Sequence, residues 1–203
     1  MITIALPKGR IADETLEIFQ KIFDEKFEFK GRELILKKAG FTFLNVRNWD
    51  VATYVEHGAV DIGVVGYDVI KELNSDVLEL LDMKLGICRV SVGGIKGDNS
   101  YKNKTELKVA TKLANIAKEY FSKKGIPAEI IKLNGSIELA PLIGLSDVIV
   151  DIVETGTTMK ENGLEVKEDV LEYVSARLIA NKNSFVAKKP QIISLYNQIK
   201  ELV

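Results

Sequence analysis

A short loop near residue 155 is dense in hydroxyl and carboxyl side chains. Residues 147–163 read DVIVDIVETGTTMKENG, in which the apolar run 148–153 predicts a buried strand. The residues that follow it are Glu154, Thr155, Gly156, Thr157 and Thr158. Glycine accepts the positive φ of a tight loop, while threonine hydroxyls and backbone N–H groups donate hydrogen bonds to an anion. A helix beginning near Thr157 would direct its positive end at the same point, so the segment predicts a phosphate-binding loop.

Two acidic side chains beside this loop change the expected ligand. Carboxylates such as Asp151 and Glu154 accept hydrogen bonds from the vicinal hydroxyls of ribose, whereas they repel a bare phosphate placed against them. The loop therefore indicates a phosphorylated ribose. It contains neither the GxxxxGK[ST] nor the GxGxxG pattern of nucleotide-binding loops. An ordinary strand–turn–helix junction with threonine as its N-cap is the alternative interpretation.

Four cationic side chains lie where a bound anion would explain their positions. Lys8 and Arg10, in the segment LPKGR, follow a predicted strand and open a predicted helix. A cation is poorly placed at the positive end of a helix unless an anion lies beside it. Arg32 and Arg47 each adjoin an apolar run, where a guanidinium could hold a phosphate through two parallel hydrogen bonds. All four could instead be solvated surface charges.

The chain contains one histidine, His57, and one cysteine, Cys88. This count excludes a histidine-cluster or cysteine-rich metal site and an internal disulfide, and it fits a reducing, cytoplasmic environment. His57 precedes Gly58 at the expected end of a helix, and Cys88 is expected to be a small buried residue of a strand. His57 is predicted to be structural or exposed and Cys88 to be structural, and no metal site built from protein ligands is predicted.

Composition excludes several classes of partner. The 203 residues are 46% hydrophobic, which is ample for a buried core, and 28 Lys and Arg against 29 Asp and Glu give a formal net charge of −1. We expect no nucleic-acid partner, since no basic stripe is present. We also expect no membrane span and no export, because no segment approaches about 18 uninterrupted apolar residues and no basic region precedes the N-terminal apolar run.

Apolar periodicity predicts an α/β fold of alternating strands and helices. The expected strands are 2–6, 41–46, 60–66, 108–111, 128–134 and 148–153, with a longer strand within 82–97 that is stopped by Gly93 and Gly94. The expected helices are 11–23, 49–58, 67–73, 115–125 and 136–144. Alternation of this kind predicts parallel sheets covered by helices, with ligands at the carboxyl ends of the strands. No flexible linker is present, so any division into lobes must come from chain crossovers.

The order of the motifs along the chain resembles that of ATP phosphoribosyltransferase. The segments that carry the resemblance are LPKGR, RELI with FLNVR, YVEHGAVDIGVVGYDV, CRVSVGG, KVATKL, KLNGSIELAPLIGLSDVIVDIVETGTTMKENGL and SARLIAN. They span nearly the whole chain, and the block 132–164 is the most specific. The length matches the short form of the family. Gly31, Trp49 and Met159 depart from the usual residues without removing a charged or loop side chain.

The resemblance implies a fold of two lobes like the type II periplasmic binding proteins, with the active site in the cleft between lobes. Residues 1–88 would form lobe I, residues 89–174 lobe II with the ribose-phosphate loop, and residues 175–203 would return to lobe I. Asp151 to Thr158 would hold phosphoribosyl pyrophosphate. The remaining expected site residues are Lys8, Gly9, Arg10, Arg32, Arg47, Thr111, Lys112, Glu138 and Leu139, and those expected to be catalytic are Arg32, Arg47, Asp151 and Glu154.

The implied reaction joins N1 of ATP to C1 of the phosphoribosyl group and releases pyrophosphate, the first step of histidine biosynthesis. Mg²⁺ would be held mainly by pyrophosphate oxygens. The short form usually works with a regulatory subunit that looks like a histidyl-tRNA synthetase, and a homo-oligomer or hetero-oligomer is expected. Two alternatives stay open: a phosphoribosyltransferase acting on a free base, and a non-catalytic two-lobed ligand-binding module.

Overall fold

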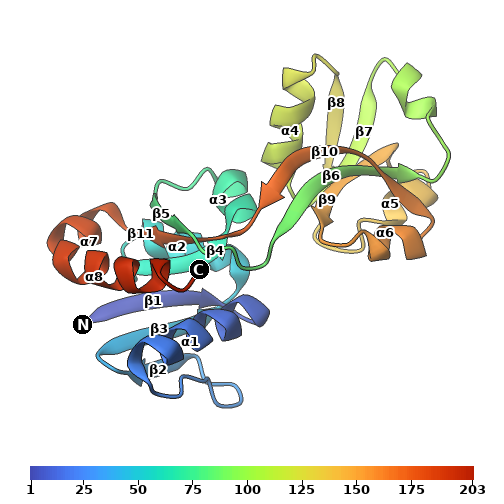
Figure 1. Cartoon of the computed structure of the whole chain (residues 1–203). Coiled ribbons are helices and arrows are strands. Elements are labelled where there is room, and N and C mark those ends of the chain that lie inside the picture. Colours follow the sequence, from blue (N-terminus) through green and yellow to red (C-terminus); the bar gives the residue numbers. More distant parts are fainter. The chain divides into compact units, whose positions relative to one another are not determined.

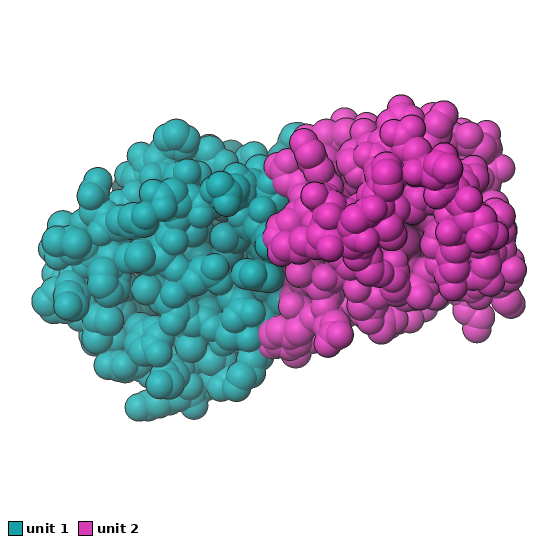
Figure 2. Space-filling model, turned by 90° about the horizontal axis from the view of Figure 1, so that it is seen from above, with its two compact units in different colours: residues 1–86, 175–203 teal, residues 87–174 magenta.

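The computed structural model describes residues 1–203, which form two compact units. Unit 1 consists of Met1–Gly86 and Ser175–Val203, and unit 2 of Ile87–Val174 (Figure 2). The chain thus leaves unit 1 after Gly86 and returns to it at Ser175. The expected first boundary lay two residues later, so residues 87 and 88 belong to unit 2.

Unit 1 is built on a six-stranded sheet in the order β2-β3-β1-β4-β11-β5 (Figure 1). Its strands are β1 (Ile2–Pro7), β2 (Ile35–Lys38), β3 (Phe41–Val46), β4 (Ile62–Gly66), β5 (Leu78–Asp82) and β11 (Ala176–Ala180). Strand β1 pairs in parallel with β3 and β4, whereas β2 is antiparallel to β3 and β11 is antiparallel to β4 and β5. The sheet is therefore mixed.

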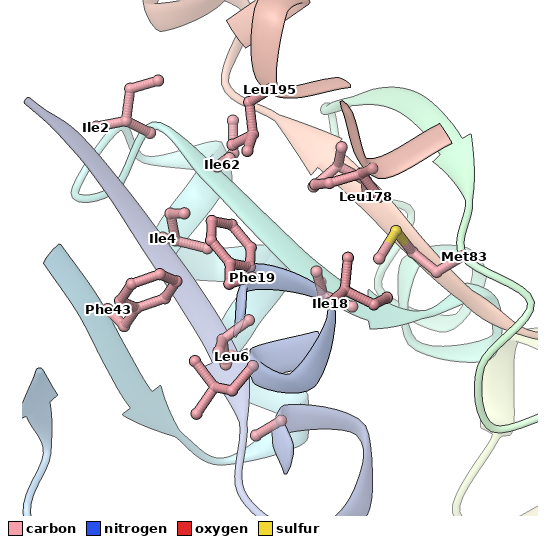
Figure 3. Packing of buried hydrophobic residues seen from close by; sticks show 14 of the residues in the cluster. Ile2, Ile4, Leu6, Ile18, Phe19, Phe43, Ile62, Met83, Leu178 and Leu195 are labelled. Atoms are coloured by element: carbon pink, nitrogen blue, oxygen red, sulfur yellow. The ribbon is translucent and has the colours of Figure 1, made fainter. Parts of the chain in front are cut away.

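Helices cover both faces of this sheet because successive strand residues point to opposite sides. They are α1 (Arg10–Phe23), α2 (Asn48–Glu56), α3 (Tyr67–Leu73), α7 (Lys182–Ala187) and α8 (Lys189–Lys200). Ile4 and Leu6 of β1 join the core made by α1 and α8, in which the ring of Phe19 lies 4.9 Å from that of Phe43, edge to face (Figure 3). Ala5, between them, instead packs with the apolar residues of α2 and α3.

Unit 2 contains a five-stranded sheet in the order β10-β6-β9-β7-β8. Its strands are β6 (Cys88–Ile95), β7 (Leu107–Thr111), β8 (Ala128–Lys132), β9 (Val148–Val153) and β10 (Leu164–Val174). Its helices are the 3₁₀ turn η1 (Ser100–Asn103), α4 (Ala114–Lys123), α5 (Leu139–Leu142) and α6 (Thr157–Glu161). Strands β8, β7 and β9 run parallel, and β6 is antiparallel to both of its neighbours. The carboxyl ends of β7 and β9 therefore meet at one edge.

The structure corrects several sequence-based expectations. Both sheets are mixed, since β2, β6, β10 and β11 run against their neighbours. Strand β6 continues through Gly93 and Gly94 to Ile95. A Cβ on Gly93 would lie 2.9 Å from the Met159 sulfur, so glycine serves close packing there and not a turn. The expected helix 136–144 is only the short α5. Cys88 opens β6 and is half-buried.

Two expectations about local structure are confirmed. His57 is the C-cap residue of α2, where its backbone N–H donates to the Thr53 carbonyl at 3.1 Å. Strand β9 and helix α6 flank the loop at the predicted positions. The described helices include none whose length and apolar character would suit a membrane span.

A part-buried ion pair joins distant segments of unit 1. Both carboxylate oxygens of Asp61 accept hydrogen bonds from Lys188 Nζ, at 2.8 and 2.7 Å, and Oδ2 also accepts from the Thr3 N–H at 2.9 Å. Burial raises the pKa of Asp61, but the bonds from Lys188 and Thr3 outweigh it, so the pKa lies below its ordinary value. The pair ties β1 and the residue before β4 to the start of α8.

Asp61→Asn should lower the free energy of unfolding by about 1–3 kcal/mol at pH 7, because it removes a charge-assisted bond and leaves Lys188 without its partner. Because the native pKa is depressed, the wild-type advantage is present above the unfolded pKa of about 4 and disappears as the pH falls through the native value. Urea unfolding between pH 3 and pH 7 measures this convergence. Asp76→Asn is the control, since Asp76 pairs with Lys182 but is 71% exposed. Equal losses in both variants at pH 7 would contradict the assignment.

Candidate functional site

A cavity of about 370 Å³ lies at the carboxyl end of β9 in unit 2. It is lined by residues 151–159 together with Lys112 and Glu138. The lining therefore includes the whole threonine-rich loop and both of its flanking carboxylates. This position agrees with the rule that open α/β sheets bind ligands beyond the carboxyl ends of their parallel strands.

The backbone of the loop is shaped for an anion. Gly156 adopts φ 80° and ψ 3°, the left-handed conformation that favours glycine, and it caps the N-terminus of α6. The first bond of the helix runs from the Lys160 N–H to the Gly156 carbonyl at 3.1 Å. The amide groups of Thr158 and Met159 precede that bond and have no acceptor within the helix. They are therefore available to donate hydrogen bonds, and in so short a helix they matter more than the macrodipole.

The threonine hydroxyls are held beside these amides. Oγ1 of Thr155 and Oγ1 of Thr157 lie 2.9 Å apart, and the Thr157 N–H donates to Thr155 Oγ1 at 3.3 Å. The carbonyl of Thr158 accepts from Asn162 Nδ2 at 2.8 Å, which fixes the turn from the other side. Hydroxyl and amide donors are thus preorganised around one point.

Asp151 forms the acidic wall of the cavity with a cation beside it. Lys112 Nζ lies 3.3 Å from Asp151 Oδ1, and the same oxygen accepts from the Ile152 N–H at 2.8 Å. The Asp151 side chain is 14% exposed and that of Lys112 31%. Because these contacts use Oδ1, the second oxygen is available to accept from a ligand hydroxyl. Glu154 lines the same cavity from the loop.

The three other residues expected near this loop differ in their placement. Glu138 lines the cavity from the residue before α5, whereas Leu139 is half-exposed and lies outside the lining. Thr111 is fully buried, and its hydroxyl donates to the Val150 carbonyl at 2.6 Å and accepts from the Leu113 N–H at 2.8 Å. Its hydroxyl therefore joins β7 to β9, and Thr111 does not line the cavity.

The expected cations of unit 1 gather at one edge of its sheet. Pro7, the last residue of β1, lies opposite Val46, the last residue of β3, in a parallel pair. Lys8 and Arg47 are the next residues along the chain, so they lie at neighbouring strand ends. The Lys8 N–H donates to the Val46 carbonyl at 2.8 Å. Gly9 caps α1 with φ 103°, a value that favours glycine. Arg10 opens α1, with Nε 3.7 Å from Glu14 Oε1.

Arg32 belongs to the same edge. Strand β2 begins at Ile35, which lies opposite Leu44 near the carboxyl end of β3, and the Asn45 N–H donates to the Leu34 carbonyl at 2.9 Å. Arg32 precedes this pairing by three residues and is exposed. The topology of unit 1 thus brings together four cations that are up to 39 positions apart in the sequence.

Sequence reasoning missed one group in unit 2. Ser91 of β6 lies opposite Asp151 of β9 and also opposite Asp169 of β10, and its hydroxyl donates to Asp169 Oδ1 at 2.6 Å. Arg89 adjoins the group, with Nε 3.5 Å from the same oxygen. No local pattern signals this cluster, because residues 164–174 were not predicted as a strand and the pairing is between distant segments.

Comparison with known proteins agrees with this geometry. The family model for ATP phosphoribosyltransferase (HisG) matches residues 47–201. The chain is 62% identical to the ATP phosphoribosyltransferase of Sulfurovum sp. over 203 residues, covering 100% of this chain and 98% of the relative. It is 59% identical to that of Campylobacter fetus subsp. fetus, with 100% of both chains covered.

Solved structures give the same result. An ATP phosphoribosyl transferase (HisG:HisZ) complex from Thermotoga maritima contains a chain that matches with a TM-score of 0.85 and 33% identity over 99% of this chain and 98% of that one. The substrate-binding protein of an amino acid ABC transporter matches with a TM-score of 0.62 at 14% identity, covering 99% of this chain and 92% of its own, which shows a shared fold alone. The two-unit α/β fold is therefore that of the periplasmic binding proteins, and the chain belongs to the ATP phosphoribosyltransferase family.

Proposed function

We infer that the chain transfers the 5-phosphoribosyl group of phosphoribosyl pyrophosphate to N1 of ATP and releases pyrophosphate, the first step of histidine biosynthesis. Family membership supports the reaction. The structural observation that carries it is the cavity of unit 2, where the donors of residues 155–159 lie next to the acceptors Asp151 and Glu154. A phosphorylated sugar needs hydrogen-bond donors for its phosphate and acceptors for its hydroxyls, and these lie at opposite ends of one small molecule.

We assign the two ends of phosphoribosyl pyrophosphate accordingly. The amides of Thr158 and Met159 and the hydroxyls of Thr155, Thr157 and Thr158 would hold the 5-phosphate. The free oxygen of Asp151, with the Glu154 carboxylate, would accept hydrogen bonds from the ribose hydroxyls. Lys112 compensates the charge of Asp151 and prevents it from repelling the anionic ligand.

The chemical step is a substitution at the anomeric carbon. The lone pair of adenine N1 forms a bond to C1 while the bond from C1 to the pyrophosphate oxygen breaks, and that oxygen leaves with its electron pair. N1 is unprotonated at neutral pH, so no base is needed for the attack, and the proton later lost from the exocyclic amine goes to a carboxylate or water. The protein's tasks are to align the reactants and to neutralise a departing polyanion.

We propose that the cations of unit 1 serve the second task. Lys8, Arg10, Arg32 and Arg47 would contact the phosphates of ATP or of the leaving pyrophosphate, with Arg32 and Arg47 as the catalytic pair. Their common sheet edge and the forked donor geometry of arginine support this role.

We propose Mg²⁺ as the cofactor, held mainly by pyrophosphate oxygens and water. The structure brings together no three Asp, Glu, His or Cys side chains suited to a metal ion, but Asp151 and Glu154 line the ligand cavity. This donor set fits a cation that arrives with its phosphate ligand and takes one or two carboxylates at most. When bound, it would neutralise charge on the leaving group.

Incubation with phosphoribosyl pyrophosphate, Mg²⁺ and either ATP or adenine tests the function. We expect pyrophosphate release and a phosphoribosyl-ATP product, seen by mass spectrometry, only with ATP. Product from adenine alone would indicate a transferase for free bases. Ligand binding without product in either reaction would indicate the non-catalytic module, whose fold this chain shares.

We also propose a regulatory partner that resembles a histidyl-tRNA synthetase. The matched structure from Thermotoga maritima is described as a HisG:HisZ complex, which supports a second subunit for this chain. The resulting assembly would be a hetero-oligomer, with histidine acting on the partner and communicating with the catalytic chain.

Two substitutions in the cavity should affect different kinetic constants. Thr158→Ala should raise KM for phosphoribosyl pyrophosphate, because a contact to the 5-phosphate is made in both ground and transition states. Asp151→Asn should chiefly lower kcat, because ribose alignment is lost. Each effect should be about tenfold to a hundredfold. Steady-state kinetics measures both, with Thr105→Ala, an exposed threonine of unit 2, as the control. Wild-type constants in both cavity variants would refute the assignment.

Histidine should leave the isolated chain nearly unaffected. All 203 residues belong to the two units that carry the proposed catalytic groups, and inhibition is assigned to the partner. We expect sensitivity to histidine to appear when the synthetase-like subunit is added to an active preparation of this chain. Initial rates with and without the partner measure the effect. Micromolar binding of histidine to this chain alone in calorimetry, with matching inhibition, would contradict the proposed division.

A further inference from the structure

A row of polar side chains begins at the ligand cavity of unit 2 and crosses three strands. Strand β6 lies between β9 and β10, and Ser91 is opposite Asp151 on one side and Asp169 on the other. Residues directly opposite one another on paired strands project from the same face of a sheet. Asp151, Ser91 and Asp169 therefore form one row on the face that carries the cavity.

Two ion pairs lie along the row, with Ser91 between their carboxylates. At one end Lys112 Nζ lies 3.3 Å from Asp151. In the middle the fully buried Ser91 donates its hydroxyl to Asp169 Oδ1 at 2.6 Å. At the other end Arg89 Nε lies 3.5 Å from that same oxygen. Two cations thus flank two carboxylates, and the buried serine fixes the position of the second one.

Arg89 lies next to the phosphate-binding loop. It is opposite Val153, the last residue of β9 and part of the cavity lining. Its Nε is buried without a hydrogen-bond partner, whereas its side chain as a whole is 40% exposed. The exposure therefore belongs to the rest of the side chain, which includes the two terminal nitrogens. The Asp169 carboxylate attracts the guanidinium at Nε. The two terminal nitrogens of Arg89 stay available to donate hydrogen bonds to a ligand.

We propose that Arg89 binds the pyrophosphate group of phosphoribosyl pyrophosphate and that Asp169, held by Ser91, is its positioning residue. This inference rests on the proposed function. In that ligand the pyrophosphate is attached to C1, the carbon next to the hydroxyl-bearing C2. If Asp151 and Glu154 hold the hydroxyls, the pyrophosphate emerges beside these carboxylates, where a cation is required.

Arg89 is better suited to this role than Lys112. Lys112 is close to Asp151 and compensates the acid that holds the ribose. Arg89 contacts a carboxylate outside the cavity lining, and its planar fork matches two phosphate oxygens. Because its negative partner is anchored by Ser91, the guanidinium enters the reaction already oriented.

Binding of three ligands separates this role from a general effect on the cavity. Calorimetry with Mg²⁺ would measure phosphoribosyl pyrophosphate, pyrophosphate and ribose 5-phosphate on each protein. Arg89→Ala should weaken the first two by at least about tenfold and change ribose 5-phosphate by less than about twofold. Asp169→Asn should show the same selectivity with a smaller effect, and Arg89→Lys should recover part of the loss. Lys123→Ala, which removes an exposed cation of α4, is the control and should change nothing.

Three results would overturn the proposal. Unchanged pyrophosphate affinity in Arg89→Ala would show that the side chain does not contact this group. Equal weakening of all three ligands, with an unchanged melting temperature, would show an indirect effect on the cavity. If Arg89→Ala does not fold, Arg89→Lys decides, and wild-type affinities together with wild-type kcat there would exclude a bidentate role. A wild-type protein that binds none of the ligands and forms no product would instead refute the proposed function itself, and this proposal with it.

Discussion

The geometry of the site depends on one apolar contact in unit 2, the packing of Met159 against Gly93 and Ile149. Met159 belongs to the short helix α6 and is 4% exposed. It can reach the sheet only because Gly93 has no side chain, since a Cβ there would lie 2.9 Å from the Met159 sulfur and 3.0 Å from Ile149. Burial of a methionine is worth about 1.5–3 kcal/mol, and here it anchors a helix of five residues that could not form alone.

The groups that stabilise α6 are therefore different from the groups that are available to bind a ligand. Because apolar packing holds α6, the amides of Thr158 and Met159 need no protein acceptor to keep their positions. They stay available for an anion, and only left-handed Gly156 is required to turn the chain between strand and helix. The same separation applies to Asp151, whose backbone lies in a paired strand while the residue lines the cavity.

Both units present polar side chains at the carboxyl ends of parallel strands, but the two sets of side chains differ in kind. In unit 2 the carboxyl ends of β7 and β9 present Lys112 and the loop, whereas in unit 1 the ends of β1 and β3 present Lys8, Arg10 and Arg47. Parallel strands place their carboxyl ends together, so residues that lie in separate loops become neighbours. One unit therefore offers mainly hydroxyl, amide and carboxylate groups at these strand ends, and the other mainly cations.

The sequence by itself determined the parts of the protein that are local. The loop could be predicted because glycine, threonines and acids stand within eight positions, and α1 because its apolar residues recur at helical spacing. Only the tertiary structure decided that Thr111 is buried, that β6 passes through Gly93, and that Ser91 lies between Asp151 and Asp169. Those facts follow from which strands pair and in which register. Pairing joins Ser91 to a residue 78 positions away, and no local pattern of side chains encodes such a contact.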